Sequence, residues 1–244
     1  MSAVPLRVED VGAVRVVTLD NPASRNALST ALNTALHDAL YAADADPAVQ
    51  VVVLTGSDPA FCAGVDLTEA AARGADYFAQ FETVDGIGAA SRIPKPIVGA
   101  VNGAAFTGGL ELALGCDFLI ASERAVFADT HMRVGVIPGG GMTARLPHLV
   151  GAGWARRMSM AGEVVDAATA LRIGLVTEVT PHAELLPRAL GVAAGIAGVP
   201  SGTMLALKQI YATSAGTPLA EALAVETRVG TAHPPEYDRL EDRR

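Results

Sequence analysis

Cysteine is scarce in this chain of 244 residues, which contains two. Cys62 and Cys116 lie far apart and match no metal-ligand spacing, so we interpret both as reduced, small apolar side chains and expect no metal site. Basic residues are also in the minority, with 18 Lys and Arg against 26 Asp and Glu and a net charge of −8. This balance argues against nucleic acid or an anionic membrane as a partner, although it leaves room for a local basic patch that grips a phosphate-bearing ligand.

Long hydrophobic runs are missing as well. No run of about 18 uninterrupted apolar residues occurs, so we expect no transmembrane helix. The N-terminal sequence MSAVPLRVED lacks the basic start and apolar stretch of a secretory signal, and we therefore expect a cytoplasmic protein. Half of the residues are apolar and 18% are charged, so a chain of this length forms one large domain or two small ones around a substantial core.

Strand and helix patterns alternate along most of the chain. Continuous or alternating apolar segments predict strands at 13–20, 49–56, 96–103 and 116–122, with a short strand near Phe127. Helical spacing predicts helices at 29–43 with Ser29 as N-cap, 108–115, 154–162, 167–174, 184–198 and 203–215. The segment 67–92 is weakly helical and is interrupted by Gly74, Gly86 and Gly88. Because strands and helices alternate up to about residue 180 and helices follow, we predict an α/β fold with a helical C-terminal region.

Two loops share one design, in which a buried strand runs into small residues and then into a helix. The first is FCAGVDL at 61–67 and the second is NGAAFTGG at 102–109. Glycines at such points let a ligand approach the backbone, and a helix N-terminus offers unpaired N–H groups. Two donors that converge on one oxygen would stabilise an oxyanion by about 3–4 kcal/mol each. The alternative is that these glycines only allow close packing of a helix on a strand.

Four segments together resemble the enoyl-CoA hydratase/isomerase family, also called the crotonase family. They are RNAL (25–28), FCAGVDL (61–67), KPIVGAVNGAAFTGGLELALGCD (95–117) and GVIPGGG (135–141), and their order and spacing match over roughly residues 10–180. The resemblance implies a crotonase-like spiral of ββα units at 1–182, and a C-terminal helical region at 183–244 that takes part in trimerisation and in the acyl-CoA pocket. It also implies an acyl-CoA thioester substrate, a homotrimer or dimer of trimers, and no cofactor beyond the coenzyme A that is part of the substrate.

In the resembling enzymes, two backbone N–H groups bind the thioester oxygen. The resemblance assigns these donors to Val65, which follows an Ala-Gly pair, and to Gly108. The CoA-contacting segments of the family correspond to five residues here, Arg25, Ala27, Ala63, Asp66 and Leu67. Arg25 is a sensible partner for a CoA phosphate, and the alternative is a solvated loop arginine. Family members also carry a basic residue near Lys208, which is a further candidate for a CoA phosphate.

Glu111 is the strongest catalytic candidate. It lies in the predicted helix 108–115, where all of the remaining residues are apolar or glycine. A carboxylate in so apolar a setting is costly unless it is hydrogen-bonded or functional, and burial would raise its pKa towards the range useful for proton transfer. The alternative is a partner for the helix dipole near the N-terminus. In the resembling hydratases, this position is one of two glutamates that hold the attacking water.

His131 stands twenty residues after Glu111, where those hydratases have their second glutamate. An imidazole titrates near neutral pH, so His131 is a candidate for the second proton-transfer group. If 127–131 is extended, Asp129 shares a face with His131 and influences the ring. The alternative is a polar surface histidine in the loop before Arg133.

Hydration of a trans-2-enoyl-CoA through an oxyanion-stabilised enolate is the leading prediction for the activity. Gly139 stands where some dienoyl-CoA isomerases and acyl-CoA hydrolases of the family are acidic, which argues against those two activities. An enoyl-CoA isomerase, or another enolate reaction that uses a single carboxylate, stays open. So does an acyl-CoA binding protein with weak catalysis. The Ala- and Gly-rich segment 68–92 is expected to set the acyl chain length.

Overall fold

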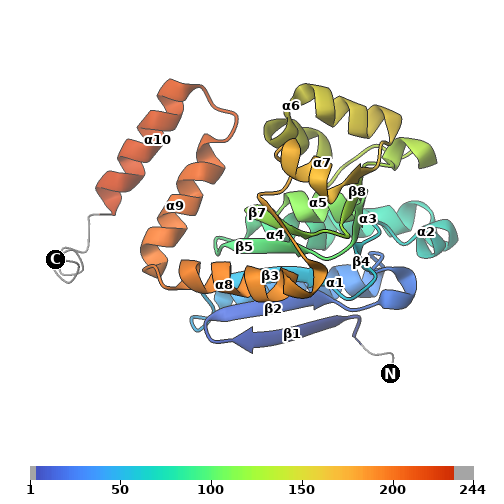
Figure 1. Ribbon diagram of the computed structural model, residues 1–244, viewed down its shortest axis with the longest axis horizontal. Coiled ribbons are helices and arrows are strands. Elements are labelled where there is room, and N and C mark those ends of the chain that lie inside the picture. The colour runs from blue at the N-terminus through green and yellow to red at the C-terminus, as the bar shows by residue number, and fades with distance from the viewer. Residues whose placement is uncertain (1–3, 234–244) are drawn as a thin grey trace.

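The computed structural model describes residues 4–233, which form two β-sheets with helices around them (Figure 1). In spatial order, the larger sheet contains β1 (Leu6–Val11), β2 (Val14–Leu19), β3 (Val51–Gly56), β5 (Ile97–Val101), β7 (Phe118–Ser122) and β10 (Glu178–Thr180). The smaller sheet contains β4 (Ala60–Cys62), β6 (Ala104–Phe106), β8 (Val126–Ala128) and β9 (Val165–Asp166). Neighbouring strands are parallel except for the pairs β1/β2 and β8/β9, which are antiparallel.

The helices connect the two sheets in a repeating order. The α-helices of the described part are α1 (Thr30–Ala45), α2 (Leu67–Arg73), α3 (Ala75–Thr83), α4 (Gly86–Arg92), α5 (Gly108–Leu114), α6 (Met142–Ala161), α7 (Ala167–Arg172), α8 (Leu185–Ala197), α9 (Ser201–Ser214) and α10 (Leu219–Ala232). Short 3-10 turns form η1 (Pro22–Ser24), η2 (His131–Val134) and η3 (His182–Glu184). A strand of the larger sheet, a short strand of the smaller sheet and then a helix follow one another from β3, β5 and β7. The predicted spiral of ββα units is confirmed.

Helix α1 shows how the sequence pattern becomes structure. The Ser29 side chain accepts a hydrogen bond from the Leu32 amide at 3.2 Å and so caps the helix as predicted. Leu32, Leu36 and Leu40 are fully buried on one face. Burial of each leucine side chain stabilises the fold by roughly 1.5–3 kcal/mol, so this face anchors α1 and the loop before it to the core.

The segment 67–92 is helical and forms α2, α3 and α4. The breaks between these helices coincide only in part with the predicted ones. Gly74 separates α2 from α3 with a φ of 58°, as expected of a helix breaker. A second break at Val84 and Asp85 directly precedes Gly86, the first residue of α4, whereas Gly88 lies inside that helix, so its prediction as a break was wrong. A Cβ at Gly86 would stand 2.6 Å from the Asn33 carbonyl oxygen, so this glycine allows α4 to pack closely on α1.

Other segments also differ from the sequence-based expectation. The segment 127–131 is not extended throughout, because β8 ends at Ala128 and His131 begins the turn η2. Strand β1 was not predicted, since its mostly exposed residues at the edge of the sheet carry little apolar signal. Helix α6 starts at Met142, earlier than predicted, and its first part contains Pro147 and a non-helical Gly151 that hid it from the pattern.

Some of the loop glycines do serve packing, as the alternative interpretation held. A Cβ at Gly109 would lie 2.1 Å from the Cys62 carbonyl oxygen, which is rigid backbone. We therefore expect Gly109→Ala to lower the free energy of unfolding by about 1–3 kcal/mol, as overpacking does. Gly191→Ala is the matched control, because Gly191 is exposed on α8 with nothing within 4 Å of its added Cβ. Chemical denaturation of both variants checks this, and wild-type stability of Gly109→Ala would contradict it.

The C-terminal helices differ in what they contact. Helix α8 packs along one face of the larger sheet against β2, β3, β5 and β7. Helices α9 and α10 lie side by side beyond the sheet (Figure 1) and pack on each other through Ala206, Val225 and Val229. No single helix within residues 4–233 is long and apolar enough to cross a bilayer, and the bent pair 182–197 and 201–214, at 107°, passes that test by length and composition only.

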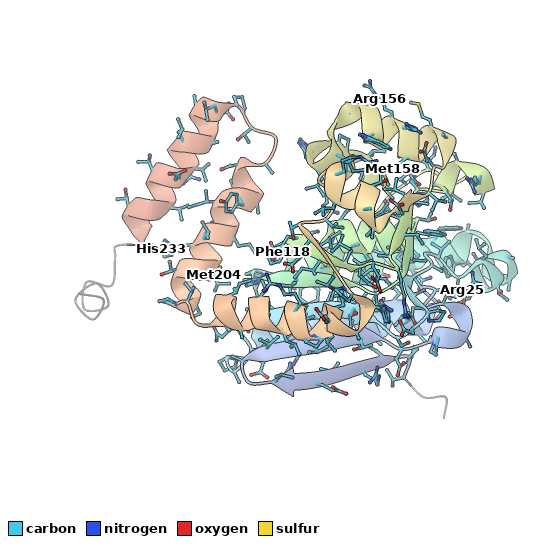
Figure 2. The ribbon with its side chains drawn as sticks, in the orientation of Figure 1. Arg25, Phe118, Arg156, Met158, Met204 and His233 are labelled. Carbon is cyan, nitrogen blue, oxygen red and sulfur yellow. The ribbon has the colours of Figure 1, made fainter. Side chains whose placement is uncertain are left out.

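Lys208 ties α9 to the body of the molecule. Its ammonium group donates to the Asp117 carboxylate at 2.9 Å and to the Lys95 carbonyl at 2.8 Å. Figure 2 shows Met204 of the same helix on the side of the molecule opposite Arg25. Within one chain, Lys208 therefore has an anionic partner already.

Candidate active site

The loop at 25–28 is fastened to the loop at 61–67 by a buried side chain that the sequence reasoning missed. The Asn26 amide donates to the carbonyls of Ser57 and Ala60 at 2.8 and 2.7 Å. The Arg25 carbonyl accepts from the Ala63 amide at 3.0 Å. Asn26 has a φ of 56°, a left-handed conformation in which asparagine is enriched. The asparagine in the motif RNAL was therefore the one sign in the sequence of a tight turn at this position.

The two glycine-containing loops meet at the candidate oxyanion donors. Gly64 has a φ of 94°, and a Cβ on it would stand 2.8 Å from the Phe106 carbonyl oxygen and 3.2 Å from the Gly108 nitrogen. In the part of the chain from 4 to 233, neither the Val65 N–H nor the Gly108 N–H donates to another group. The structure thus brings Val65 and Gly108 together with both donors uncommitted, as an oxyanion site needs.

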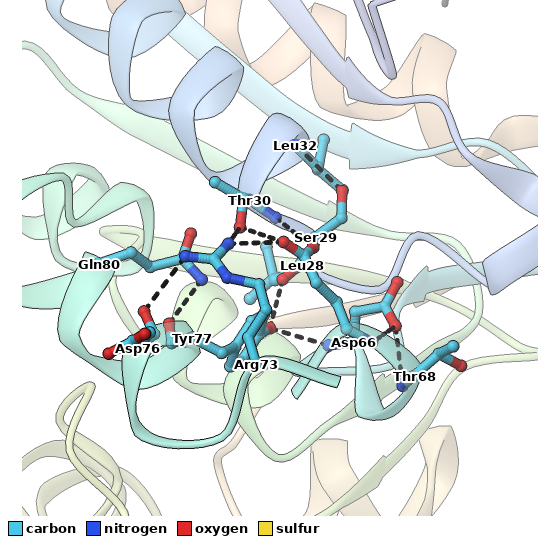
Figure 3. Close-up of polar contacts among 11 residues, drawn as sticks. Leu28, Ser29, Thr30, Leu32, Asp66, Thr68, Arg73, Asp76, Tyr77 and Gln80 are labelled. Atoms are coloured by element: carbon cyan, nitrogen blue, oxygen red, sulfur yellow. Dashed lines mark hydrogen bonds and ion pairs between the residues drawn. The ribbon is translucent and has the colours of Figure 1, made fainter. Parts of the chain in front are cut away.

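The five candidate CoA-contacting residues surround this meeting point. Ala27 is buried, Ala63 and Asp66 are half-buried, and Arg25 and Leu67 are exposed. They share one region because Leu28 pairs with Val65 in a parallel bridge. Asp66 also has a structural task, since its carboxylate accepts from the Thr68 and Glu69 amides at 3.0 Å each and caps α2 (Figure 3).

Glu111 is buried in the first turn of α5 with 2% of its surface exposed. One carboxylate oxygen, Oε1, accepts from the Gly140 and Met142 amides at 2.8 and 3.1 Å. Burial raises the pKa of Glu111, although these two hydrogen bonds act in the opposite direction. A Cβ at Gly140 would lie 2.8 Å from Oε2, so a glycine at this position lets the backbone before α6 pack directly against the carboxylate. Sequence reasoning used that run only for the resemblance and missed this contact.

His131 lies beside Glu111 in the interior. It is 4% exposed, so the alternative of a surface histidine was wrong. Its Nε2 stands 3.6 Å from Glu111 Oε2, and its Nδ1 stands 2.7 Å from Asp129 Oδ1. The expected influence of Asp129 is thus present, although a turn rather than an extended strand brings the two side chains together. Burial acts to raise the pKa of Asp129, but hydrogen bonds led by that from His131 hold it below its ordinary value.

These three side chains form a connected series from Asp129 through His131 to Glu111. The ionised carboxylate of Asp129 accepts a hydrogen bond from the Nδ1–H of His131 and so fixes the orientation of the ring, which leaves Nε2 facing Glu111. The 3.6 Å between Nε2 and Oε2 is too long for a direct hydrogen bond, and a water beside the pair would reach both atoms. The arrangement is suited to moving one proton onto and another off a bound molecule.

Burial of Glu111 has a consequence for stability. Because its pKa is raised in the folded state, its contribution to stability is fully present below the ordinary glutamate pKa and is lost as the pH rises through the folded value. Glu111→Gln should therefore gain stability relative to the wild type as the pH rises. Thermal unfolding of both proteins between about pH 4 and 8 measures the difference. A difference in melting temperature that is constant with pH would contradict the prediction.

The two cysteines play no part in this site. Both are free thiols, and burial raises the pKa of each to about 12, so neither is a reactive thiolate at neutral pH. Within residues 4–233, no group of three or more His, Cys, Asp or Glu side chains has the geometry to hold a metal ion.

Comparison with known proteins defines the class of this molecule. Residues 9–241 match the enoyl-CoA hydratase/isomerase family. The chain is 41% identical to a probable enoyl-CoA hydratase of Rhizobium meliloti, over 94% of this chain and 89% of that protein. It is 38% identical to the probable peroxisomal enoyl-CoA hydratase 1 of Arabidopsis thaliana, over 89% and 82%.

Solved structures agree with the sequence comparison. The enoyl-CoA hydratase of Mycobacterium tuberculosis H37Rv superimposes with a TM-score of 0.78 and 45% identity, covering 93% of this chain and 98% of that one. The enzyme from Bacillus anthracis gives 0.90 and 32%, covering 98% and 94%. The crotonase-like fold is confirmed. This chain belongs to the enoyl-CoA hydratase/isomerase family and is an enzyme of that family.

Proposed function

We propose that this enzyme adds water to a trans-2-enoyl-CoA thioester. The observation that carries the proposal is the meeting of two uncommitted backbone donors, at Val65 and Gly108, next to the buried pair of Glu111 and His131. The names of the relatives, most of which are enoyl-CoA hydratases, support the same reaction.

Hydration requires a base for the attacking water and an acid for C2 of the substrate. As the water oxygen bonds to C3, its proton passes to whichever of Glu111 Oε2 and His131 Nε2 is unprotonated. The C2=C3 electrons shift, and negative charge develops on the thioester oxygen between the Val65 and Gly108 N–H groups. The other member of the pair then delivers its proton to C2, which completes the 3-hydroxyacyl thioester and leaves the pair with the same number of protons.

The remaining predictions complete this proposal. Arg25, Ala27, Ala63, Asp66 and Leu67 would contact the CoA part of the substrate, and no other cofactor would take part. Residues 1–182 would form the spiral core, while 183–244 would take part in the acyl-CoA pocket and in a homotrimer or dimer of trimers; residues 234–244 lie outside those the structure describes. A cytoplasmic location is supported by the bacterial relatives, whereas other relatives are named as peroxisomal or mitochondrial.

The direct test is the loss of the conjugated-thioester absorbance of crotonyl-CoA and of a longer enoyl-CoA. We expect turnover of at least one of them, with a 3-hydroxyacyl-CoA as the product. No turnover with CoA-ester binding intact by calorimetry would overturn the hydratase proposal and leave a different enolate reaction or a binding protein.

A family isomerase is the second candidate, because Glu111 is the single carboxylate of α5 and an isomerase moves one proton with such a group. Product analysis separates the two reactions. A 3-enoyl-CoA that converts to its 2-enoyl isomer without gain of water would favour the isomerase.

A further inference from the structure

Tyr77 is the single buried residue of α3. Its hydroxyl group reaches the loop at 61–67 that carries the candidate donor Val65, which we call the oxyanion loop. The hydroxyl accepts a hydrogen bond from the Asp66 amide at 2.9 Å and donates to the Leu28 carbonyl (Figure 3). Burial raises the pKa of Tyr77, so the phenol keeps the proton that it donates. One side chain therefore joins the 25–28 loop to the residue that follows Val65.

These two contacts fix the peptide group that carries the Val65 N–H. That N–H belongs to the same planar unit as the Gly64 carbonyl, which accepts from the Leu28 amide at 2.7 Å. Leu28 thus holds one side of the peptide plane with its N–H, while its own carbonyl is held by Tyr77. Tyr77 also holds the amide on the far side of Val65. Three hydrogen bonds therefore set the direction of the Val65 N–H. Leu28 makes one with the Gly64 carbonyl, and the Tyr77 hydroxyl makes the other two, with the Leu28 carbonyl and the Asp66 amide.

The same tyrosine fastens α3 to the loops beside it through its hydroxyl group. Its ring packs edge-on against Phe78 and Phe81 of the same helix, with ring centres 5.2 and 5.7 Å away. Next to it, Glu69 of α2 bonds to the Thr30 amide at the start of α1 and pairs with Arg73 at the end of α2. Figure 3 shows Thr30 and Arg73 beside Tyr77. Tyr77 is the one fully buried side chain of α3, with Phe81 half-buried against the core, so a displacement of α3 is transmitted to Val65 through the Tyr77 hydroxyl.

We propose that Tyr77 is a positioning residue for the Val65 oxyanion donor. Through Tyr77, the position of α3 affects the strength of the hydrogen bond from the Val65 N–H to the thioester oxygen. This rests on the role of Val65 in the proposed function. Removal of the hydroxyl leaves the ring, the burial and the CoA-contacting loop in place but frees the peptide to rotate. The loss should appear where charge develops on the oxygen and not in ground-state binding.

Tyr77→Phe is the decisive variant, and Tyr41→Phe, on α1, is its control. We expect kcat for crotonyl-CoA to fall about 10-fold, below the 10²–10³-fold of a donor removed outright, with KM changed less than about 3-fold. Bound 4-dimethylaminocinnamoyl-CoA reports carbonyl polarisation as a red shift of its absorbance, which should shrink in Tyr77→Phe at saturation. The affinity for S-butyl-CoA, a thioether without the carbonyl oxygen, should stay unchanged.

Other outcomes overturn the proposal. An unchanged red shift and kcat would do so, as would an equal loss of affinity for thioester and thioether, since a residue that only supports the fold has that effect. Should Tyr77→Phe not fold, 3-fluorotyrosine placed at position 77 keeps the ring and the hydroxyl but alters its hydrogen bonds, and the same replacement at Tyr41 is the control; only the former should change the red shift. Because the red shift needs no turnover, failure of the hydratase proposal remains distinguishable from failure of this one.

Discussion

Glu111→Gln is expected to lower kcat/KM for enoyl-CoA hydration by about 10²–10⁴-fold, the usual range for loss of a general acid–base group. The amide oxygen of glutamine still accepts from the Gly140 and Met142 amides, so these two hydrogen bonds are kept while proton transfer is lost. Binding of S-butyl-CoA should be unaffected. Initial rates and calorimetry on the same preparation measure both quantities.

The control for this substitution is Glu9→Gln, which makes the same chemical change on an exposed side chain of β1. It should retain full activity. If Glu111→Gln kept more than about a tenth of the wild-type rate, Glu111 would not be the acid–base group, because even modest general acid–base catalysis exceeds that factor.

His131→Gln is expected to lower kcat/KM by about 10²–10³-fold, because Glu111 then lacks its partner for the second proton. His37→Gln, on the surface of α1, serves as the control. A wild-type rate in His131→Gln would show that Glu111 works alone, and it would favour the single-carboxylate chemistry of an isomerase.

Asp129→Asn separates the orienting role of Asp129 from its charge. Asparagine still accepts from Nδ1 through its carbonyl oxygen, so a loss of about 10-fold is expected, smaller than that of His131→Gln. The negative charge of Asp129 acts to raise the pKa of Glu111, so its loss disfavours protonation of that carboxylate. The limb of the kcat/KM–pH profile that belongs to Glu111 should therefore move to lower pH. An unchanged profile would mean that Asp129 only supports the fold.

Most of the fold was predictable because its strands are continuous apolar runs and its helices have apolar faces. β3 and β5 are buried along their whole length, and their sequences VVVLTG and IVGAV carry a strong signal. Edge strand β1 and the first half of α6 were not predictable in this way. Their stability comes from pairing with β2 and from packing over α5, which no local pattern records.

Much of the candidate site was also accessible, since Glu111 stands out among apolar neighbours and the loop glycines suggest close approach to backbone. Asn26, Gly140 and Tyr77 were not, although each bonds or contacts the machinery directly. Their partners lie 34, 29 and 11 positions away along the chain. A single sequence gives no sign of such pairings.

The sequence by itself determined the α/β class, the two glycine-containing loops and the candidate carboxylate of Glu111, because residue periodicity, backbone freedom at glycine and the cost of burying charge all act locally. The spiral of ββα units and the assignment of Val65 and Gly108 as donors came from the resemblance of four sequence segments to a known family. Tertiary structure alone decided that His131 is buried against Glu111, that Asp129 orients it from a turn, and that Tyr77 holds the oxyanion loop. Those relations depend on which distant segments the two sheets bring within hydrogen-bonding distance, and hydrogen bonds and desolvation act only at that range.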